Sequence, residues 1–417
     1  MHSFLRRGKD LFCEGAPLGE IAARFGTPLY VYSEATLARH TRVFDEAFAG
    51  TEHLVCFAVK ANPSLALLDL LARHGAGADI VSGGELARAL AAGVPGERIV
   101  YSGVGKTVAE MERALDAGIL MFNIESFEEL EALDAVAGRM GCKAPISLRV
   151  NPDVDPGTHA YVATGLKTSK FGIPFASAIA GYERAGALRH IEVVGVDCHV
   201  GSQITEVAPF VDAVSKIGEL VACLRGRGFG IRYLDVGGGL GITYDDERPP
   251  SPAEYGRAVR DAMGVTGLTL VLEPGRNLIG NAGVLLTRVL YVKESGDKRF
   301  VIVDAGMNDL LRPSLYDAYH AVVPVRDEGR APFVADVVGP ICESGDFFAK
   351  DRELPEVGQG DLLAVMSAGA YGFSMASTYN SRPLAAEVLV RGERAALIRE
   401  RGTYADLTRG ERLPEFS

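Results

Sequence analysis

The sequence predicts an α/β protein: a (β/α)8 TIM barrel followed by a mostly antiparallel β-sandwich or β-barrel domain. Three observations support this. Short apolar runs alternate with helical stretches between residues 54 and 275, and these runs number eight. After about residue 280, longer strand-like runs follow one another without helices between them. The 417 residues also exceed the ~250–300 at which a single core usually stops growing, so two domains are expected.

The eight apolar runs are the expected barrel strands. They are rich in β-branched residues and nearly continuous, as suits strands buried on both faces. An open, doubly wound sheet is the structural alternative. The runs are LVCFAVK (54–60), GADIVSG (77–83), RIVYSG (98–103), LMFNIES (120–126), ISLRVNP (146–152), EVVGVDCHVG (192–201), IRYLDVGGG (231–239) and LTLVLEPG (268–275).

The stretches between the runs are the expected helices. Apolar residues recur in them at i, i+3 and i+4, and the first four each end at a glycine, where a helix favours a left-handed residue. These four are 64–75, 84–93, 108–118 and 126–141, and similar crossovers lie around 174–186, 208–228 and 252–264.

The strand-like runs after residue 280 predict the β domain. We place the barrel at 31–280 and the β domain at 281–417 together with 1–30, because PLYVYSEATL (28–37) could add a strand to the sheet. The runs of the β domain are 283–294, 299–306, 333–342, 361–371 and 387–400.

Composition and charge restrict the partners and the compartment. The net charge is −11 and the acidic and basic residues are interspersed, which argues against a nucleic-acid partner. No long apolar run follows the basic N-terminus or occurs elsewhere, so we expect a cytoplasmic protein that does not enter a membrane.

The six cysteines do not predict a metal site. They lie far apart, without a CxxC pair or a histidine at zinc spacing. We expect five of them to be buried as small hydrophobic residues in a reducing compartment: Cys13, Cys56, Cys142, Cys198 and Cys223. Cys342 is treated separately below.

Residues that are awkward in a barrel core stand at the ends of five runs. Lys60 ends the first run, residues 82–85 follow the second, His199 ends the sixth, residues 237–239 follow the seventh, and Glu273 ends the eighth. The carboxyl ends of barrel strands form the face that carries the active site. These five positions therefore predict one pocket.

The chemistry of these residues suggests pyridoxal 5′-phosphate (PLP). Lys60, backed by Phe57 and Val59, would be desolvated, which favours a nucleophilic amine and Schiff-base formation. The three glycines at 237–239 could present N–H groups to a phosphate. Glu273 could keep a pyridine nitrogen protonated, and His199 could stack on the ring. Taken singly, the lysine could be a surface residue and the glycines a turn.

Seven motifs resemble a known family. FAVKAN (57–62), HVGSQ (199–203), GGGLG (237–241), EPGR (273–276), RPSLYDAYH (312–320), CESGD (342–346) and AGAYG (368–372) are similar to segments of the barrel-type, PLP-dependent decarboxylases of basic amino acids. These share an alanine racemase-like fold, and CESGD and SLYDAYH resemble the diaminopimelate decarboxylases most. The resemblance covers nearly the whole chain.

The resemblance implies an activity and a role for each site residue. It implies decarboxylation of meso-2,6-diaminopimelate to L-lysine and CO2, the last step of lysine biosynthesis, with Cys342 as the acid that reprotonates the carbanion. Lys60 would form the imine with PLP. The other implied cofactor residues are His199, Ser202, Gly238, Gly239, Glu273, Gly275, Arg276 and Tyr371. The implied substrate residues are Arg276, Arg312, Tyr316, Glu343 and Tyr371. In this family the cysteine reaches the partner's site, which implies a homodimer with shared active sites.

Three alternatives stay open at this point. The first is decarboxylation of another basic amino acid or polyamine precursor, such as ornithine, arginine or carboxynorspermidine. A diamine product needs no clamp for a distal carboxylate, so the arginine pair and Glu343 argue against it. The second is an aldolase that uses Lys60 without PLP, and the third is a PLP-binding carrier without turnover. The glycine loop with Glu273 disfavours the second, and a second domain bearing Cys342 and Tyr371 disfavours the third.

Overall fold

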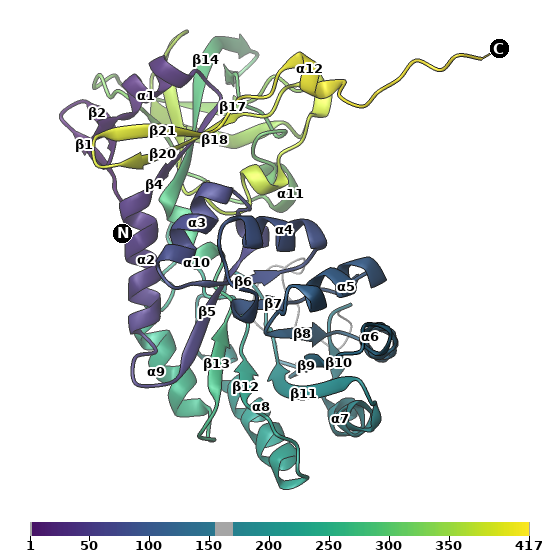
Figure 1. Cartoon of the computed structure of the whole chain (residues 1–417). Coiled ribbons are helices and arrows are strands. Elements are labelled where there is room, and N and C mark those ends of the chain that lie inside the picture. The colour runs from purple at the N-terminus through teal and green to yellow at the C-terminus, as the bar shows by residue number, and fades with distance from the viewer. Residues whose placement is uncertain (1, 155–169, 417) are drawn as a thin grey trace. The chain divides into compact units, whose positions relative to one another are not determined.

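The computed structural model of the chain describes residues 2–154 and 170–416 (Figure 1). The chain forms two compact units, which we call the barrel unit (Ala38–Leu278) and the β unit (Met1–Leu37 with Ile279–Ser417). The sequence placed the corresponding boundaries at 30/31 and 280/281.

The barrel unit contains a closed parallel barrel. Within the described residues, each of its eight strands pairs in parallel with the next, and the last pairs with the first through Val271 and Leu54. The predicted barrel is confirmed, and the open sheet is excluded. The strands are β5 (His53–Ala58), β6 (Gly77–Ile80), β7 (Ile99–Tyr101), β8 (Met121–Ile124), β9 (Ala144–Asn151), β11 (Ile191–Asp197), β12 (Tyr233–Asp235) and β13 (Thr269–Leu272), and a short β10 (Ile173–Pro174) extends from β9.

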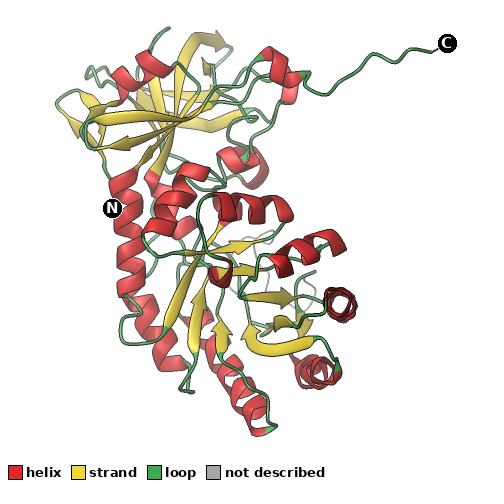
Figure 2. Cartoon of the chain, viewed as in Figure 1, coloured by secondary structure: helices red, strands yellow, loops and turns green. Residues whose placement is uncertain are grey.

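Helices follow the barrel strands as predicted, and in Figure 2 α5 to α8 lie on the outside of the strands. Four of these helices, α3, α4, α5 and α6, end just before a glycine with positive φ. These glycines are Gly75, Gly93, Gly118 and Gly141, and their left-handed backbone explains why the helices end there. The bounds are α2 (Glu34–Glu46), α3 (Leu65–Arg73), α4 (Gly83–Ala91), α5 (Val108–Asp116), α6 (Phe127–Met140), α7 (Ala178–Ala187), α8 (Ala208–Gly226), α9 (Pro252–Ala262) and α10 (Arg276–Ile279), with the 3-10 turns η1 (Val59–Ala61), η2 (Gly96–Arg98) and η3 (Phe175–Ser177).

The β unit is built on a mostly antiparallel sheet, as predicted. Its main path runs β18-β17-β15-β14-β4-β20-β21, with two parallel pairs, β15 with β17 and β4 with β20. The strand expected from PLYVYSEATL is β4 (Leu29–Ser33), which lies between β14 and β20. The other strands of this sheet are β14 (Gly283–Ser295), β15 (Lys298–Val303), β16 (Val322–Pro324), β17 (Pro332–Val338), β18 (Phe347–Pro355), β19 (Leu362–Val365), β20 (Ala386–Arg391) and β21 (Arg394–Arg399).

Smaller elements complete the β unit. Two strands, β16 and β18, were not expected from the sequence, which contains no long β-branched run at either place. A small antiparallel sheet precedes β4. The remaining elements are β1 (Phe4–Arg7), β2 (Asp10–Cys13), β3 (Ala16–Pro17), α1 (Leu18–Phe25), α11 (Arg312–Tyr316), α12 (Tyr404–Leu407), η4 (Gly280–Ala282), η5 (Phe373–Met375) and η6 (Tyr379–Ser381).

The burial of the cysteines was predicted correctly only in part. Cys13, Cys56 and Cys198 are buried, whereas Cys142 is half-buried and Cys223 is exposed. Cys223 lies on α8, whose buried face is formed by residues such as Ile217 and Leu224, so the cysteine is on the opposite side of the helix. Among the helices that the structure describes, none combines the length and apolar character needed to cross a membrane.

Candidate active site

Lys60 lies just beyond the end of its strand and has a carboxylate partner. Strand β5 ends at Ala58, and Lys60 belongs to the 3-10 turn that follows. Its Nζ lies 2.9 Å from Oδ2 of Asp79, at the end of β6, and 37% of its side-chain surface is exposed. Lys60 is therefore less desolvated than the sequence suggested, and it has a buried carboxylate beside it.

Asp79 is a site residue that the sequence reading missed. It is fully buried, and its second oxygen, Oδ1, has no hydrogen-bond partner within the described residues. A carboxylate inside the apolar run GADIVSG was the signal that could have revealed it, because a buried charge is rarely left without a function or an ion pair.

His199 and the glycine loop are in direct contact. The N–H of Gly238 lies 3.1 Å from Nδ1 of His199 and donates to it. Burial lowers the pKa of His199 well below its usual value, and the positive charges of Arg149 and Lys60 act in the same direction. The ring is therefore neutral near pH 7, which is the form that can accept this hydrogen bond.

The glycines of this loop are required by their surroundings. A Cβ at Gly238 would lie 2.3 Å from the carbonyl oxygen of Glu273, and one at Gly239 would lie 2.6 Å from that of Gly201. Gly239 also has a φ of +114°. Only glycine fits, and the bare backbone lets a ligand approach closely.

Arg276 and Ser202 are joined across the barrel mouth. Arg276, only 8% exposed, donates through Nη2 to Oγ of Ser202 at 3.0 Å and through Nη1 to the hydroxyl of Tyr244 at 2.7 Å. Gly275, one residue before, has no room for a side chain because Ala61 and Ala58 lie against it. The EPGR segment therefore packs on the turn that carries Lys60.

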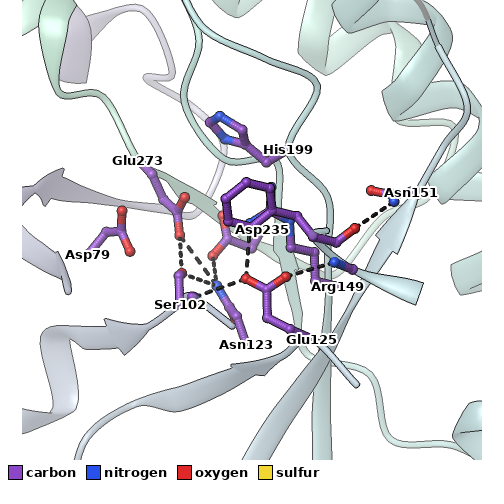
Figure 3. Close-up of polar contacts among 12 residues, drawn as sticks. Asp79, Ser102, Asn123, Glu125, Arg149, Asn151, His199, Asp235 and Glu273 are labelled. Carbon is purple, nitrogen blue, oxygen red and sulfur yellow. Dashed lines mark hydrogen bonds and ion pairs between the residues drawn. The ribbon is translucent and has the colours of Figure 1, made fainter. Parts of the chain in front are cut away.

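Glu273 is held inside the barrel by two donors (Figure 3). Its Oε1 accepts from the hydroxyl of Ser102 at 3.2 Å and from the side-chain amide of Asn123 at 3.3 Å. Burial raises the pKa of Glu273 to about 7, and the negative charge of Asp79 adds to the rise. Lys60 and Arg149 act against it.

Further polar residues of the barrel interior were missed as well. Asn123 also donates to Asp235, and Arg149 pairs with Glu125 at 3.1 Å. Burial raises the pKa of Asp235 and of Asp197 well above the usual range. Each of these residues interrupts an apolar run, a signal that was visible in the sequence.

The structure thus brings the predicted barrel residues to the ends of the strands. They come from four separate segments of the chain, which carry the motifs FAVKAN, HVGSQ, GGGLG and EPGR. The residues are Lys60, His199, Ser202, Gly238, Gly239, Glu273, Gly275 and Arg276.

In the β unit, Arg312 is buried and held by a histidine. It opens α11, is 6% exposed, and its Nη1 lies 2.9 Å from Nε2 of His320. Nδ1 of His320 in turn lies 2.8 Å from the carbonyl oxygen of Met366. The carbonyl can only accept, so Nδ1 carries the proton and Nε2 accepts from the guanidinium.

The loop that carries Cys342 and Glu343 is exposed but firmly tied. The backbone N–H of Cys342 donates to Oδ1 of Asn380 at 2.7 Å. The buried carboxylate of Asp346 accepts from the N–H groups of Met307 at 2.6 Å and of Ile341 at 2.7 Å. Both predicted residues are therefore fixed through their backbone while their side chains face solvent.

The two segments of the β unit that carry predicted site residues are linked. The hydroxyl of Ser314, on α11 with Arg312 and Tyr316, donates to the carbonyl oxygen of Gly345 in the Cys342 loop. Tyr371 lies in a tight turn, with a φ of +55°, and is partly buried. Its side chain is thereby directed by an uncommon backbone conformation.

Comparison with known proteins decides the family. Residues 34–280 match the family model described as the pyridoxal binding domain of pyridoxal-dependent decarboxylases. Diaminopimelate decarboxylase from Pseudomonas aeruginosa is 57% identical over 413 residues, which cover 99% of each chain. This chain belongs to the diaminopimelate decarboxylase family. The predicted resemblance is confirmed.

Solved structures of diaminopimelate decarboxylases share the whole fold. The enzyme from M. jannaschii in complex with L-lysine has a TM-score of 0.94 at 40% identity, covering 99% of this chain and 98% of that one. The enzyme from Helicobacter pylori, also in complex with L-lysine, has a TM-score of 0.91 at 43% identity, covering 94% and 98%. Both units of the chain are therefore those of diaminopimelate decarboxylases.

Proposed function

We propose that this protein decarboxylates meso-2,6-diaminopimelate to L-lysine and CO2 with PLP as its cofactor. The observation that carries the proposal is the convergence of Lys60, His199, the glycine loop and Glu273 at the barrel strand ends. Relatives that match over the full length are diaminopimelate decarboxylases. The family and the site geometry therefore support the same activity.

The barrel residues fit PLP. Lys60 supplies an amine for the aldehyde carbon, and the loop around Gly238 and Gly239, with Ser202 nearby, suits a phosphate. Glu273, with a pKa of about 7, can share a proton with a pyridine nitrogen. His199 is neutral and beside the loop, which suits stacking on an aromatic ring.

When bound, PLP supplies the electron sink that takes up the electrons left behind as CO2 departs. The protein's residues orient the substrate and manage protons. Glu273 would stabilise a proton on the ring nitrogen, and Asp79 pairs with Lys60 at 2.9 Å and holds it in place.

The β unit supplies residues suited to the rest of the substrate. Arg312 presents a planar guanidinium, which pairs bidentately with a carboxylate, and we assign it with Arg276 and Tyr316 to the distal carboxylate. Glu343 is assigned to the distal ammonium, and Tyr371 is assigned to both the cofactor and the substrate. Cys342, exposed on its tied loop, is assigned to deliver the proton to the substrate carbon.

We further assign a homodimer with two shared active sites. The thiol of Cys342 is exposed, whereas a proton donor works best in a site from which water is excluded. A partner subunit that covers this loop would exclude water from it. A symmetric dimer is the most common arrangement of soluble oligomers.

The test is a direct assay of the purified protein loaded with PLP. We expect CO2 release from meso-diaminopimelate with L-lysine as the product, and little release from ornithine or arginine. Equal or faster release from ornithine or arginine would redirect the assignment to another basic amino acid. CO2 release from none of the three would reject the decarboxylase assignment.

A further inference from the structure

Asn123 occupies a central position among the buried polar groups of the barrel. It lies on β8, is fully buried, and its Nδ2 is within reach of three acceptors. These are Oδ2 of Asp235 at 3.0 Å, Oγ of Ser102 at 3.1 Å and Oε1 of Glu273 at 3.3 Å (Figure 3). One amide group therefore contacts the end of two other strands and the carboxylate of the EPGR segment.

The surroundings fix the orientation of this amide. Oδ1 of Asn123 accepts from the hydroxyl of Ser147 at 2.6 Å, on the side away from the carboxylates. With Oδ1 directed at Ser147, the NH2 group of Asn123 faces Glu273 and Asp235. Asn123 is consequently a donor to both acids at once.

The two acids that share Asn123 are also joined through the glycine loop. Oδ1 of Asp235 accepts from the N–H of Gly237 at 2.9 Å, and the carbonyl oxygen of Gly237 accepts from the N–H of Glu273 at 2.8 Å. The loop assigned to the phosphate and the acid assigned to the ring nitrogen thus rest on the same small network.

The charges around Glu273 come from several strands. Asp79 on β6, Asp197 on β11 and Asp235 on β12 are negative when ionised, and Lys60 and Arg149 are positive. An acid in such a site needs donors to stay ionised. Among the described residues, the side chains of Ser102 and Asn123 donate to its Oε1.

We propose that Asn123 is a positioning residue that keeps Glu273 ionised and in one orientation toward the ring nitrogen of the cofactor. Hydrogen bonds to a carboxylate favour its charged form. Both donors act on Oε1, which fixes the rotation of the carboxylate and hence the direction of Oε2. The inference rests on the proposed function and deepens it, because it names the residue that tunes the cofactor's electron sink.

The test measures protonation of the cofactor's ring nitrogen directly. The protein is loaded with PLP labelled with 15N at the ring, and the nitrogen's NMR shift is recorded at several pH values for wild type and Asn123→Leu. Without the amide donor, the pKa of Glu273 should rise by about one, so that Glu273 and not the ring nitrogen holds the proton. We expect the signal of Asn123→Leu to move toward that of a neutral pyridine, with kcat lowered about 10- to 100-fold.

A matched control separates positioning from simple loss of stability. Tyr182→Phe removes another fully buried polar group of the barrel, whose hydroxyl is hydrogen-bonded, within the described part of the chain, to the backbone of Leu148 and Gly195. It should lower the melting temperature but leave the 15N signal unchanged. If Asn123→Leu does not fold, Ser102→Ala removes the other donor to the same oxygen and should shift the signal in the same direction.

A double variant tests whether Asn123 acts through Glu273. Once Glu273→Gln has removed the acid, adding Asn123→Leu should reduce kcat little further. A 15N signal in Asn123→Leu and Ser102→Ala identical to wild type would overturn the proposal. The signal needs only bound PLP, so a wild-type protein that binds PLP but releases no CO2 would refute the proposed function while still testing this one.

Discussion

The sequence can single out a site residue without showing which residues surround it. Lys60 could be singled out because a lysine at the end of an apolar run is unusual. Its partner, Asp79, decides its electrostatics, and the ion pair at 2.9 Å joins residues from different strands. The sequence analysis therefore singled out the amine but not the carboxylate that pairs with it.

At the residue scale, two variants of Lys60 separate its covalent role from its charge. Lys60→Ala and Lys60→Arg should both lose covalent attachment of PLP and nearly all decarboxylation, because neither provides a primary amine. Lys60→Ala also leaves the buried Asp79 without its cation and should unfold at a lower temperature than Lys60→Arg. Visible absorbance of the bound cofactor and thermal unfolding check this, and wild-type turnover in either variant would contradict it.

Elements were predicted more reliably than their exact ends. Glycines marked the ends of the first four helices, and the eight runs became strands in the expected order. The strand ends differ, because β5 stops two residues before Lys60 and β11 two residues before His199. These residues lie in the turns after the strands, where the backbone is free to direct a side chain into the site.

At the element scale, the glycine loop should not tolerate a side chain. In Gly238→Ala the new Cβ would meet the carbonyl oxygen of Glu273 at 2.3 Å, and backbone cannot move aside as a flexible side chain can. We expect a loss of about 1–3 kcal/mol in the free energy of unfolding and weaker PLP retention on dialysis.

The matched control for this loop is Gly226→Ala, at the end of α8. A Cβ there meets nothing within 4 Å, so stability should stay within about 1 kcal/mol of wild type. Equal stability and equal PLP retention in the two variants would contradict this prediction, because they would mean that a Cβ fits at Gly238.

The whole molecule carries buried acids whose titration affects its stability. The pKa of Glu273 is raised to about 7 mainly by burial, so the folded state binds more protons than the unfolded state between pH 4.5 and 7. Its contribution is therefore most favourable at low pH and is lost as the pH rises through 7. Glu85 and Asp309, with pKa values also raised to about 7 by burial, act in the same direction.

At the scale of the whole molecule, Glu273→Gln isolates this effect in the protein without cofactor. Glutamine stays neutral at every pH, so the variant should gain stability relative to wild type as the pH rises from 5 to 8, by at most about 3 kcal/mol. Urea unfolding at several pH values measures the difference. A difference that is constant with pH would mean that Glu273 titrates normally.

The proposed homodimer with shared active sites predicts complementation between inactive subunits. Lys60→Ala and Cys342→Ala homodimers should each lose most activity, the latter by a factor of about 10²–10⁴. Mixed dimers contain one site with both residues intact, so mixing the two variants should restore about a quarter of the wild-type rate. Sedimentation checks the dimer itself, and a dimer without recovery would place both residues of each site in one chain.

The sequence by itself determined the strands, the helices, their order and the residues at the strand ends. This was possible because apolar periodicity and glycine positions are local, and because all parallel strands of a barrel end on one face. Motif wording then identified the family. None of these inferences required knowing which side chains touch.

Only the tertiary structure decided how the polar interior of the barrel is connected. Asn123 meets Asp235, 112 residues away, and Glu273, 150 residues away, and Ser102 meets Glu273 across 171 residues. Such contacts depend on strand register and barrel closure, which no local pattern encodes. The contacts that these groups make with Glu273 and Lys60 therefore depend on closure of the barrel, which brings eight separate strands around one interior.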